Sequence, residues 1–167
     1  MIEALETYIK TMNWRYEKVT SQQTRVSYKM FFKMRNGSYC MFFDLIPDQY
    51  SLAVYCYSPV DIPIEAIPAV GDFVNRVNFN IYHGKLEINM DDGTVRYSCD
   101  MCLKDSPLAP GIISYMENSA AFGMDDHFSS LMAIVHGGKE PNQVFEDLMN
   151  EEITESIKEN VTTQSLH

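Results

Sequence analysis

The segment that most constrains the fold lies between Gly84 and Met101, where two alternating runs flank a glycine turn. Apolar side chains occupy every second position on both sides of that turn: Leu86, Ile88, Met90, Val95, Tyr97, Cys99 and Met101. Successive side chains of a strand point to opposite faces, so the pattern predicts a β-hairpin with one face in the core. Asp92 and Gly93 predict the turn, because Asp-Gly is a preferred pair in tight hairpins.

A second group of strands precedes this hairpin. Strands are expected over residues 14–19, 26–34, 39–46 and 50–57, separated by polar or proline-containing turns. The Asn36-Gly37 pair predicts a type I′ turn, in which both central residues take positive φ. Short strands joined by such turns are typical of an antiparallel meander.

Two runs in this meander, Met30-Phe31-Phe32 and Met41-Phe42-Phe43, are apolar at consecutive positions. A strand with one face in solvent alternates between apolar and polar residues, whereas a strand covered on both faces does not. We therefore infer that both sheet faces are covered, by helices or by a second subunit.

Helical periodicity appears in four places: residues 2–12, 64–77, 109–136 and from 141 onward. Pro68 predicts a late start or a kink in the second helix, because proline disrupts a helix interior. In the last helix Phe145, Met149 and Ile153 are four residues apart and share an apolar stripe. The polar tail over residues 160–167 is expected to fray.

The order of these elements predicts an α+β fold, an antiparallel sheet with helices packed on it and an extra C-terminal helix. A chain of 167 residues is the length of one ordinary domain. We expect residues 1–149 to form the domain and residues 150–167 to form a helical extension ending in the frayed tail.

The formal net charge is −10, from 23 acidic and 13 basic residues. This balance argues against binding to nucleic-acid phosphates and against docking on anionic lipid. The N-terminal residues lack the basic and apolar regions of a signal peptide, and no apolar window reaches the ~18 residues of a membrane span. We therefore expect a cytoplasmic protein without nucleic-acid or membrane partners, whose four cysteines stay reduced.

Motifs for covalent chemistry are sparse. The spacing of Cys99 and Cys102 is typical of redox or zinc sites, but residues three apart on a strand point to opposite faces. A small-ligand or metal-binding protein using these two cysteines remains the alternative. Asp125-Asp126-His127 would fan out around a helix, which favours a solvated helix face. No nucleophile or phosphate-loop motif occurs, so the sequence predicts neither an enzyme nor a cofactor.

Polar residues at the end of the second helix are the best candidates for an interaction or structural role. Amide side chains there readily cap local backbone groups, which is the simpler interpretation of Asn75 and Asn78. Eleven Met, ten Tyr and nine Phe also supply apolar surface that suits protein partners. The candidate residues are Asn75, Arg76, Asn78, Phe145, Met149 and Ile153.

Most of the chain, from about Leu5 to Leu148 and most strongly from Phe73 to Leu103, resembles the bacterial YbjN-like family, which is regarded as a family of sensory transduction regulators. The resemblance is carried by Phe73-Val74-Asn75-Arg76-Val77-Asn78, Gly84-Lys85-Leu86-Glu87-Ile88 and Asp92-Gly93-Thr94-Val95-Arg96-Tyr97. The later Met124-Asp125-Asp126 and Val135-His136-Gly137-Gly138 are also similar to it. Val74 and Leu86 depart from the residues most common there, Leu and Phe.

The resemblance implies a fold similar to class I type III secretion chaperones, which are commonly homodimers, and it implies no catalytic residues. We therefore expect a non-enzymatic protein-interaction module, a chaperone-like or regulatory homodimer that binds protein partners.

Overall fold

A computed structural model describes residues 1–22 and 25–164. The helices and strands follow one another as α1 (Ile2–Thr11), β1 (Tyr16–Gln22), β2 (Arg25–Lys33), β3 (Ser38–Ile46), η1 (Pro47–Gln49), β4 (Ser51–Tyr57), η2 (Ile64–Ala66), α2 (Ile67–Asn78), β5 (Lys85–Ile88), β6 (Val95–Cys102), α3 (Pro110–Val135) and α4 (Pro141–Gln164). The predicted α+β class and the predicted order of elements are confirmed.

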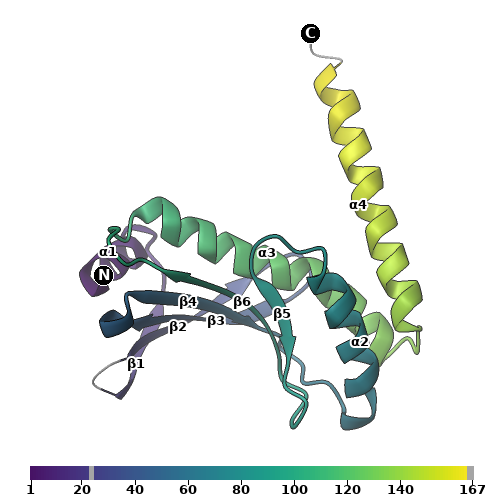
Figure 1. Cartoon of the computed structure of the whole chain (residues 1–167), viewed down its shortest axis with the longest axis horizontal. Helices are drawn as coiled ribbons and strands as arrows, with labels where there is room; N and C mark the ends of the chain where they lie inside the picture. Colours follow the sequence, from purple (N-terminus) through teal and green to yellow (C-terminus); the bar gives the residue numbers. More distant parts are fainter. Residues whose placement is uncertain (23–24, 165–167) are drawn as a thin grey trace.

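The meander and the hairpin form one sheet of six antiparallel strands in the order β1-β2-β3-β4-β6-β5 (Figure 1). The joining pair is β4 with β6, in which Val54 lies opposite Cys99. The crossover through α2 carries the chain past β6, so that β5 becomes the edge strand. Sequence periodicity predicted two groups of strands but not this pairing between them.

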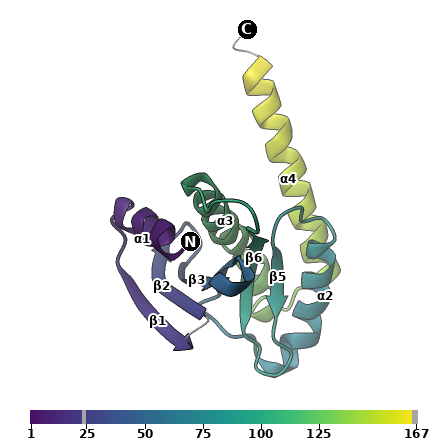
Figure 2. The ribbon, with the colours of Figure 1, turned by 60° about the vertical axis from the view of Figure 1, so that its left-hand side comes forward.

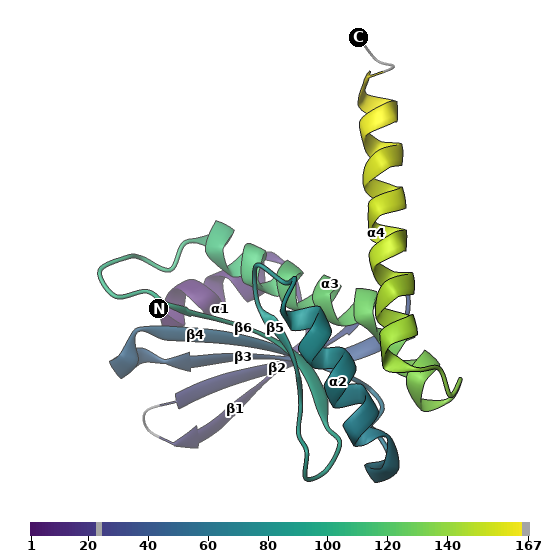
Figure 3. The same cartoon turned by 45° about the vertical axis from the view of Figure 1, so that its right-hand side comes forward.

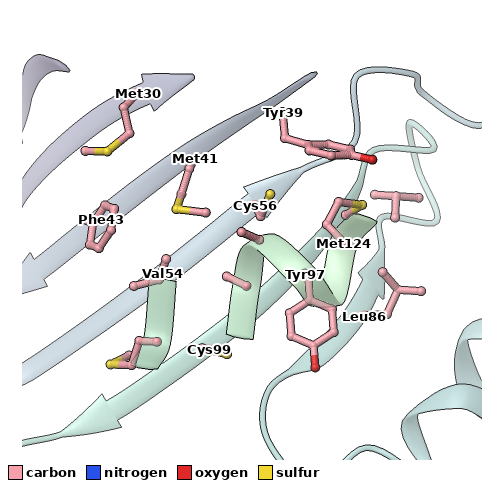
Figure 4. Packing of buried hydrophobic residues seen from close by; sticks show 14 of the residues in the cluster. Met30, Tyr39, Met41, Phe43, Val54, Cys56, Leu86, Tyr97, Cys99 and Met124 are labelled. Atoms are coloured by element: carbon pink, nitrogen blue, oxygen red, sulfur yellow. The ribbon is translucent and has the colours of Figure 1, made fainter. Parts of the chain in front are cut away.

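The helices cover one face of the sheet. Figure 2 shows α1 and α3 on the same side, while α2 lies beside the β5 edge. The core between them holds Met30, Met41 and Phe43 from the meander, with Tyr97 and Met124 from β6 and α3 (Figure 4). These side chains are almost completely buried, and burial of apolar area is the main favourable term in folding.

Gly123 lets α3 approach the sheet closely. A Cβ at this position would lie 2.4 Å from the Tyr97 ring, whose hydroxyl donates a 2.7 Å hydrogen bond to the His83 carbonyl. The glycine therefore serves packing between α3 and β6, within an α-helix that runs from Pro110 to Val135.

Two local expectations need correction. Neither Asn36 nor Gly37 has positive φ, so the β2–β3 connection is not a type I′ turn. Instead the Met34 amide donates to the Gly37 carbonyl at 2.8 Å, which puts Arg35 and Asn36 at the centre of the turn. Ile64, predicted on the apolar stripe of the second helix, is 76% exposed, because Pro68 occupies the first turn and α2 begins only at Ile67.

Among the α4 side chains that the structure describes, those packed on the domain lie near the start of the helix. Val144 is buried in the common core, whereas Ile153 is 58% exposed. Figure 3 shows the rest of α4 extending away from the sheet and from α3. The helix is continuous through Gln164, and the end of the predicted frayed tail, residues 165–167, lies outside the described residues. The division at residues 149 and 150 stays a prediction.

Candidate functional site

A groove lies where the C-terminal end of α2 meets the start of α4. It has a volume of about 660 Å³ and is lined by Asn75, Arg76, Asn78, Phe79, Asn80 and Phe145. Four of the six candidate residues thus come together, although Phe145 is distant from the other three in sequence. Met149 and Ile153 do not line the groove; they lie farther along α4, Met149 partly buried and Ile153 exposed.

Asn78 fixes the backbone where α2 gives way to β5. Its side-chain amide donates to the Leu86 carbonyl at 2.8 Å, and its side-chain oxygen accepts from the Leu86 amide at 2.9 Å. The Asn80 side chain also donates to the Arg76 carbonyl at 3.2 Å, close to the free carbonyls of the helix end. The interpretation of Asn78 as a partner of local backbone groups is confirmed.

Arg76 links the two helices that form the groove. Its Nε lies 2.9 Å from Asp72 Oδ2 one turn earlier on α2, and its Nη1 donates to Asn142 Oδ1 at 3.0 Å on α4. Asn142 in turn donates to Glu146 at 2.7 Å. These side chains are largely exposed, so the Arg76–Asp72 ion pair contributes little to stability, while the bond to Asn142 connects α2 to α4.

The apolar part of the groove is unusually exposed. Phe79 is 92% exposed, Phe145 is half-buried, and the nearby chain also presents Tyr82 at 95% exposure. Sequence analysis treated Phe79 only as part of a helix end and missed it as a site residue. One feature of the sequence could have identified it: Phe79 is an aromatic residue between two asparagines at a helix end. It does not belong to the apolar stripe that predicts the buried face of the helix.

The groove has little that could drive covalent chemistry. Amides, one guanidinium paired with carboxylate and amide oxygens, and two phenyl rings provide hydrogen bonds and apolar contact. Side chains of these types suit recognition of a peptide segment, in which backbone groups meet amides and an apolar anchor meets the rings.

Acidic side chains buried under α3 have structural partners. Asp125 accepts hydrogen bonds from the Asn36 amide at 2.9 Å and from the Tyr39 hydroxyl at 2.8 Å. His127 is also buried and stacks on Tyr97 at 6.4 Å between ring centroids. The prediction of a solvated helix face for this segment was therefore wrong for Asp125 and His127, because α3 turns both toward the sheet.

Glu117 is the other buried carboxylate of α3. The Tyr8 hydroxyl of α1 donates to it at 3.0 Å. Burial raises the pKa of Glu117, and the hydrogen bond from Tyr8 offsets only part of that effect. This hydrogen bond joins α1 to α3.

The two cysteines of the alternative hypothesis do not converge. Cys99 is buried on the helix-covered face of β6, whereas Cys102 is exposed three residues later and its Sγ lies 3.9 Å from the Gln49 carbonyl. Burial raises the pKa of the Cys99 thiol to about 11, which disfavours the thiolate that a metal requires. Among the described residues, no group of three His, Cys, Asp or Glu side chains is arranged to hold a metal ion.

The fold and the groove define a class of protein: an α+β domain built on a six-stranded antiparallel open sheet, with helices packed against it and C-terminal helices beyond. Over residues 2–121 the chain matches the YbjN family model, described as "Putative bacterial sensory transduction regulator". The chain belongs to this family, and the match runs from α1 into the middle of α3.

Neither the curated proteins nor the solved structures gave a match. The similarity to type III secretion chaperones therefore stays a prediction. Within the part of the chain that the structure describes, no helix has the length and apolar character needed to cross a membrane.

Proposed function

We propose that this protein is a non-enzymatic interaction module, a chaperone-like or regulatory homodimer of the cytoplasm, that binds an apolar segment of a partner protein in the α2–α4 groove. The observation that carries the proposal is the exposure of Phe79 above a groove of about 660 Å³. Phe79 and the half-buried Phe145 line the same groove, and contiguous exposed apolar surface of this kind marks protein-interaction sites.

Three further features support this role. The YbjN family is regarded as regulatory, which fits a protein that acts by binding. Asn75 lines the groove beside the two phenyl rings, where its amide can orient a peptide backbone. Beyond Met149, α4 extends away from the domain and can lengthen the contact surface along a partner.

The test compares Phe79→Glu with Phe122→Glu, a matched change at an exposed phenylalanine of α3 that lies outside the groove. Tagged wild-type protein and both variants are purified at equal expression from the native cells, and co-purifying proteins are quantified by mass spectrometry. A true groove partner is depleted at least about tenfold by Phe79→Glu and is unaffected by Phe122→Glu.

The partner identified in this way is then purified, and its binding to the three proteins is measured by calorimetry. Equal affinity for the wild type and for Phe79→Glu contradicts binding in the groove. The alternative, a metal-binding protein using Cys99 and Cys102, requires stoichiometric zinc in the purified protein that is lost in Cys102→Ser.

A further inference from the structure

The sheet face opposite α1 and α3, here called the open face, carries a ridge of aromatic side chains. Strand register places Phe31, Phe42, Tyr55 and Tyr57 on this face, across three neighbouring strands. Phe42 and Tyr57 contact edge to face at 5.6 Å between ring centroids, and Phe31 is 72% exposed. Figure 1 shows no described helix covering this side of the sheet.

Two cations lie over the same ridge. Lys29 Nζ is 5.4 Å from the Phe31 ring centroid, and the Arg96 guanidinium is 4.3 Å from that of Tyr55. Arg96 also pairs with Glu87 at 2.7 Å. Aromatic and arginine side chains are the residue types enriched at the centres of protein interfaces.

Two buried polar atoms on the open face lack a hydrogen-bond partner in the described part of the chain. They are Oδ1 of Asp44, whose Oδ2 pairs with Arg25, and Oγ of Ser98. Their residues are only 4% and 2% exposed, and the small side chain of Ala53 lies beside Asp44 on β4. Both atoms are shielded by neighbouring side chains of the chain itself, so they mark the closely packed part of the open face.

The charge of the open face separates it from the rest of the molecule. Strand register places five basic side chains on it, Arg25, Lys29, Lys33, Lys85 and Arg96. Four acidic side chains share it, Glu17, Asp44, Glu87 and Asp100. The face is therefore near +1 in a chain of net charge −10. Two copies of this chain repel each other through most surfaces, but the open face presents both signs of charge to a second copy.

We propose that the open face is the homodimer interface and that two copies pack sheet on sheet through their aromatic ridges. The inference rests on the homodimer of the proposed function and adds the place where the second copy binds. This arrangement also accounts for the apolar runs of β2 and β3, because α1 and α3 bury the side chains on one face of the sheet and the second copy buries those on the other.

The size of the face suits this role. Strands lie about 4.8 Å apart and a seven-residue strand is about 24 Å long, so six strands present about 600 Å² per copy. Two such faces bury about 1,200 Å², the lower end of stable interfaces. Figures 1 and 3 show α4 rising on the α3 side of the sheet, so it leaves the open face clear and the groove free for a partner.

The test measures the oligomeric state of the full chain by sedimentation velocity over a concentration series. Phe31→Glu places a carboxylate on the ridge at a side chain that is already 72% exposed, so the monomer keeps its fold, which circular dichroism checks. Lys29→Glu keeps every aromatic residue and makes the face acidic. Phe79→Glu in the groove is the matched control.

The expected result is a dimeric wild type, an unchanged dimer for Phe79→Glu, and a dimer dissociation constant raised at least about 30-fold by Phe31→Glu, as at an interface hot spot. Lys29→Glu also weakens the dimer, and high salt reverses part of that loss because the new charges are screened.

A wild type that is monomeric at every concentration overturns the proposal. So does a dimer unaffected by Phe31→Glu and Lys29→Glu, or one that Phe79→Glu dissociates. Partner binding by Phe31→Glu separates the two proposals: if its dimer persists while Phe79→Glu still loses the partner, the groove stands and the open-face interface falls.

Discussion

Met30 and Phe31 are neighbours on β2, yet one is 2% exposed and the other 72% exposed. The same contrast holds on β3, where Phe43 is fully buried and Phe42 keeps part of its ring accessible. One face of the sheet is filled by α1 and α3, whereas no described helix reaches the other. Apolar character in these strands therefore serves two purposes, core formation on the covered face and, as we propose, association on the open face.

The largest effect in this comparison of the two sheet faces is expected from Phe43→Ala on the covered face. Phe43 lies in the core with its ring centroid 6.5 Å from that of Trp14. Its truncation leaves a cavity under α1 and is expected to lower the free energy of unfolding by about 3–5 kcal/mol. Urea denaturation followed by circular dichroism measures the change, and a loss below about 1 kcal/mol would contradict the assignment of this face as the core.

A smaller loss is expected from Gly123→Ala. The added methyl meets the buried Tyr97 ring, so the free energy of unfolding falls by about 1–3 kcal/mol, although alanine is the better helix former. Gly111→Ala on the same helix is the control, because nothing lies within 4 Å of its added Cβ. If both variants are equally stable in urea denaturation, close approach of α3 to β6 is not the reason for this glycine.

Glu117→Gln tests the pH sensitivity of the α1–α3 contact. The pKa of Glu117 is raised in the folded protein by burial, so its contribution is fully present below the unfolded pKa and is lost as pH rises through the folded pKa. The glutamine variant lacks this loss and can still accept from Tyr8. Its stability relative to wild type should therefore increase from pH 4 to pH 7 in urea titrations at each pH. A pH-independent difference would show that Glu117 is not the group responsible.

The smallest effect is expected from Phe31→Ala on the open face. At protein concentrations low enough for a monomer, the change should alter the free energy of unfolding by no more than about 0.5 kcal/mol, because the ring is mostly in solvent. At higher concentrations the variant should lose the concentration-dependent stabilisation that dimerisation gives the wild type. Thermal melts over a dilution series measure both, and a large loss in the dilute monomer would mean that Phe31 supports the fold itself.

Much of the secondary structure could be predicted from local pattern. The α1 stripe, the hairpin around Gly93 with φ of +76°, and the start of α2 set by Pro68 all follow from neighbouring residues. The type of the turn at Asn36 and Gly37 could not be predicted in this way, because the Asn36 amide donates a hydrogen bond to Asp125, which is 89 residues away. A distant hydrogen bond can override a turn preference and leaves no signal in the nearby sequence.

The candidate site was predictable in part. Asn75, Arg76 and Asn78 are close in sequence and lie together at the end of α2, but their meeting with Phe145 depends on how α4 packs. Phe79 was missed because sequence periodicity describes buried faces, and an exposed ring has no period. Met149 and Ile153 were grouped with Phe145 by spacing, yet of the three only Phe145 lines the groove.

The sequence by itself determined the elements, the α+β class and the family, because these depend on residue type and short-range spacing. Tertiary structure decided which face of β2 and β3 lies in the core, why Asp125 and His127 are buried, and where a groove exists. Those outcomes depend on which surface each helix reaches, and that choice is made by contacts between residues far apart in the chain.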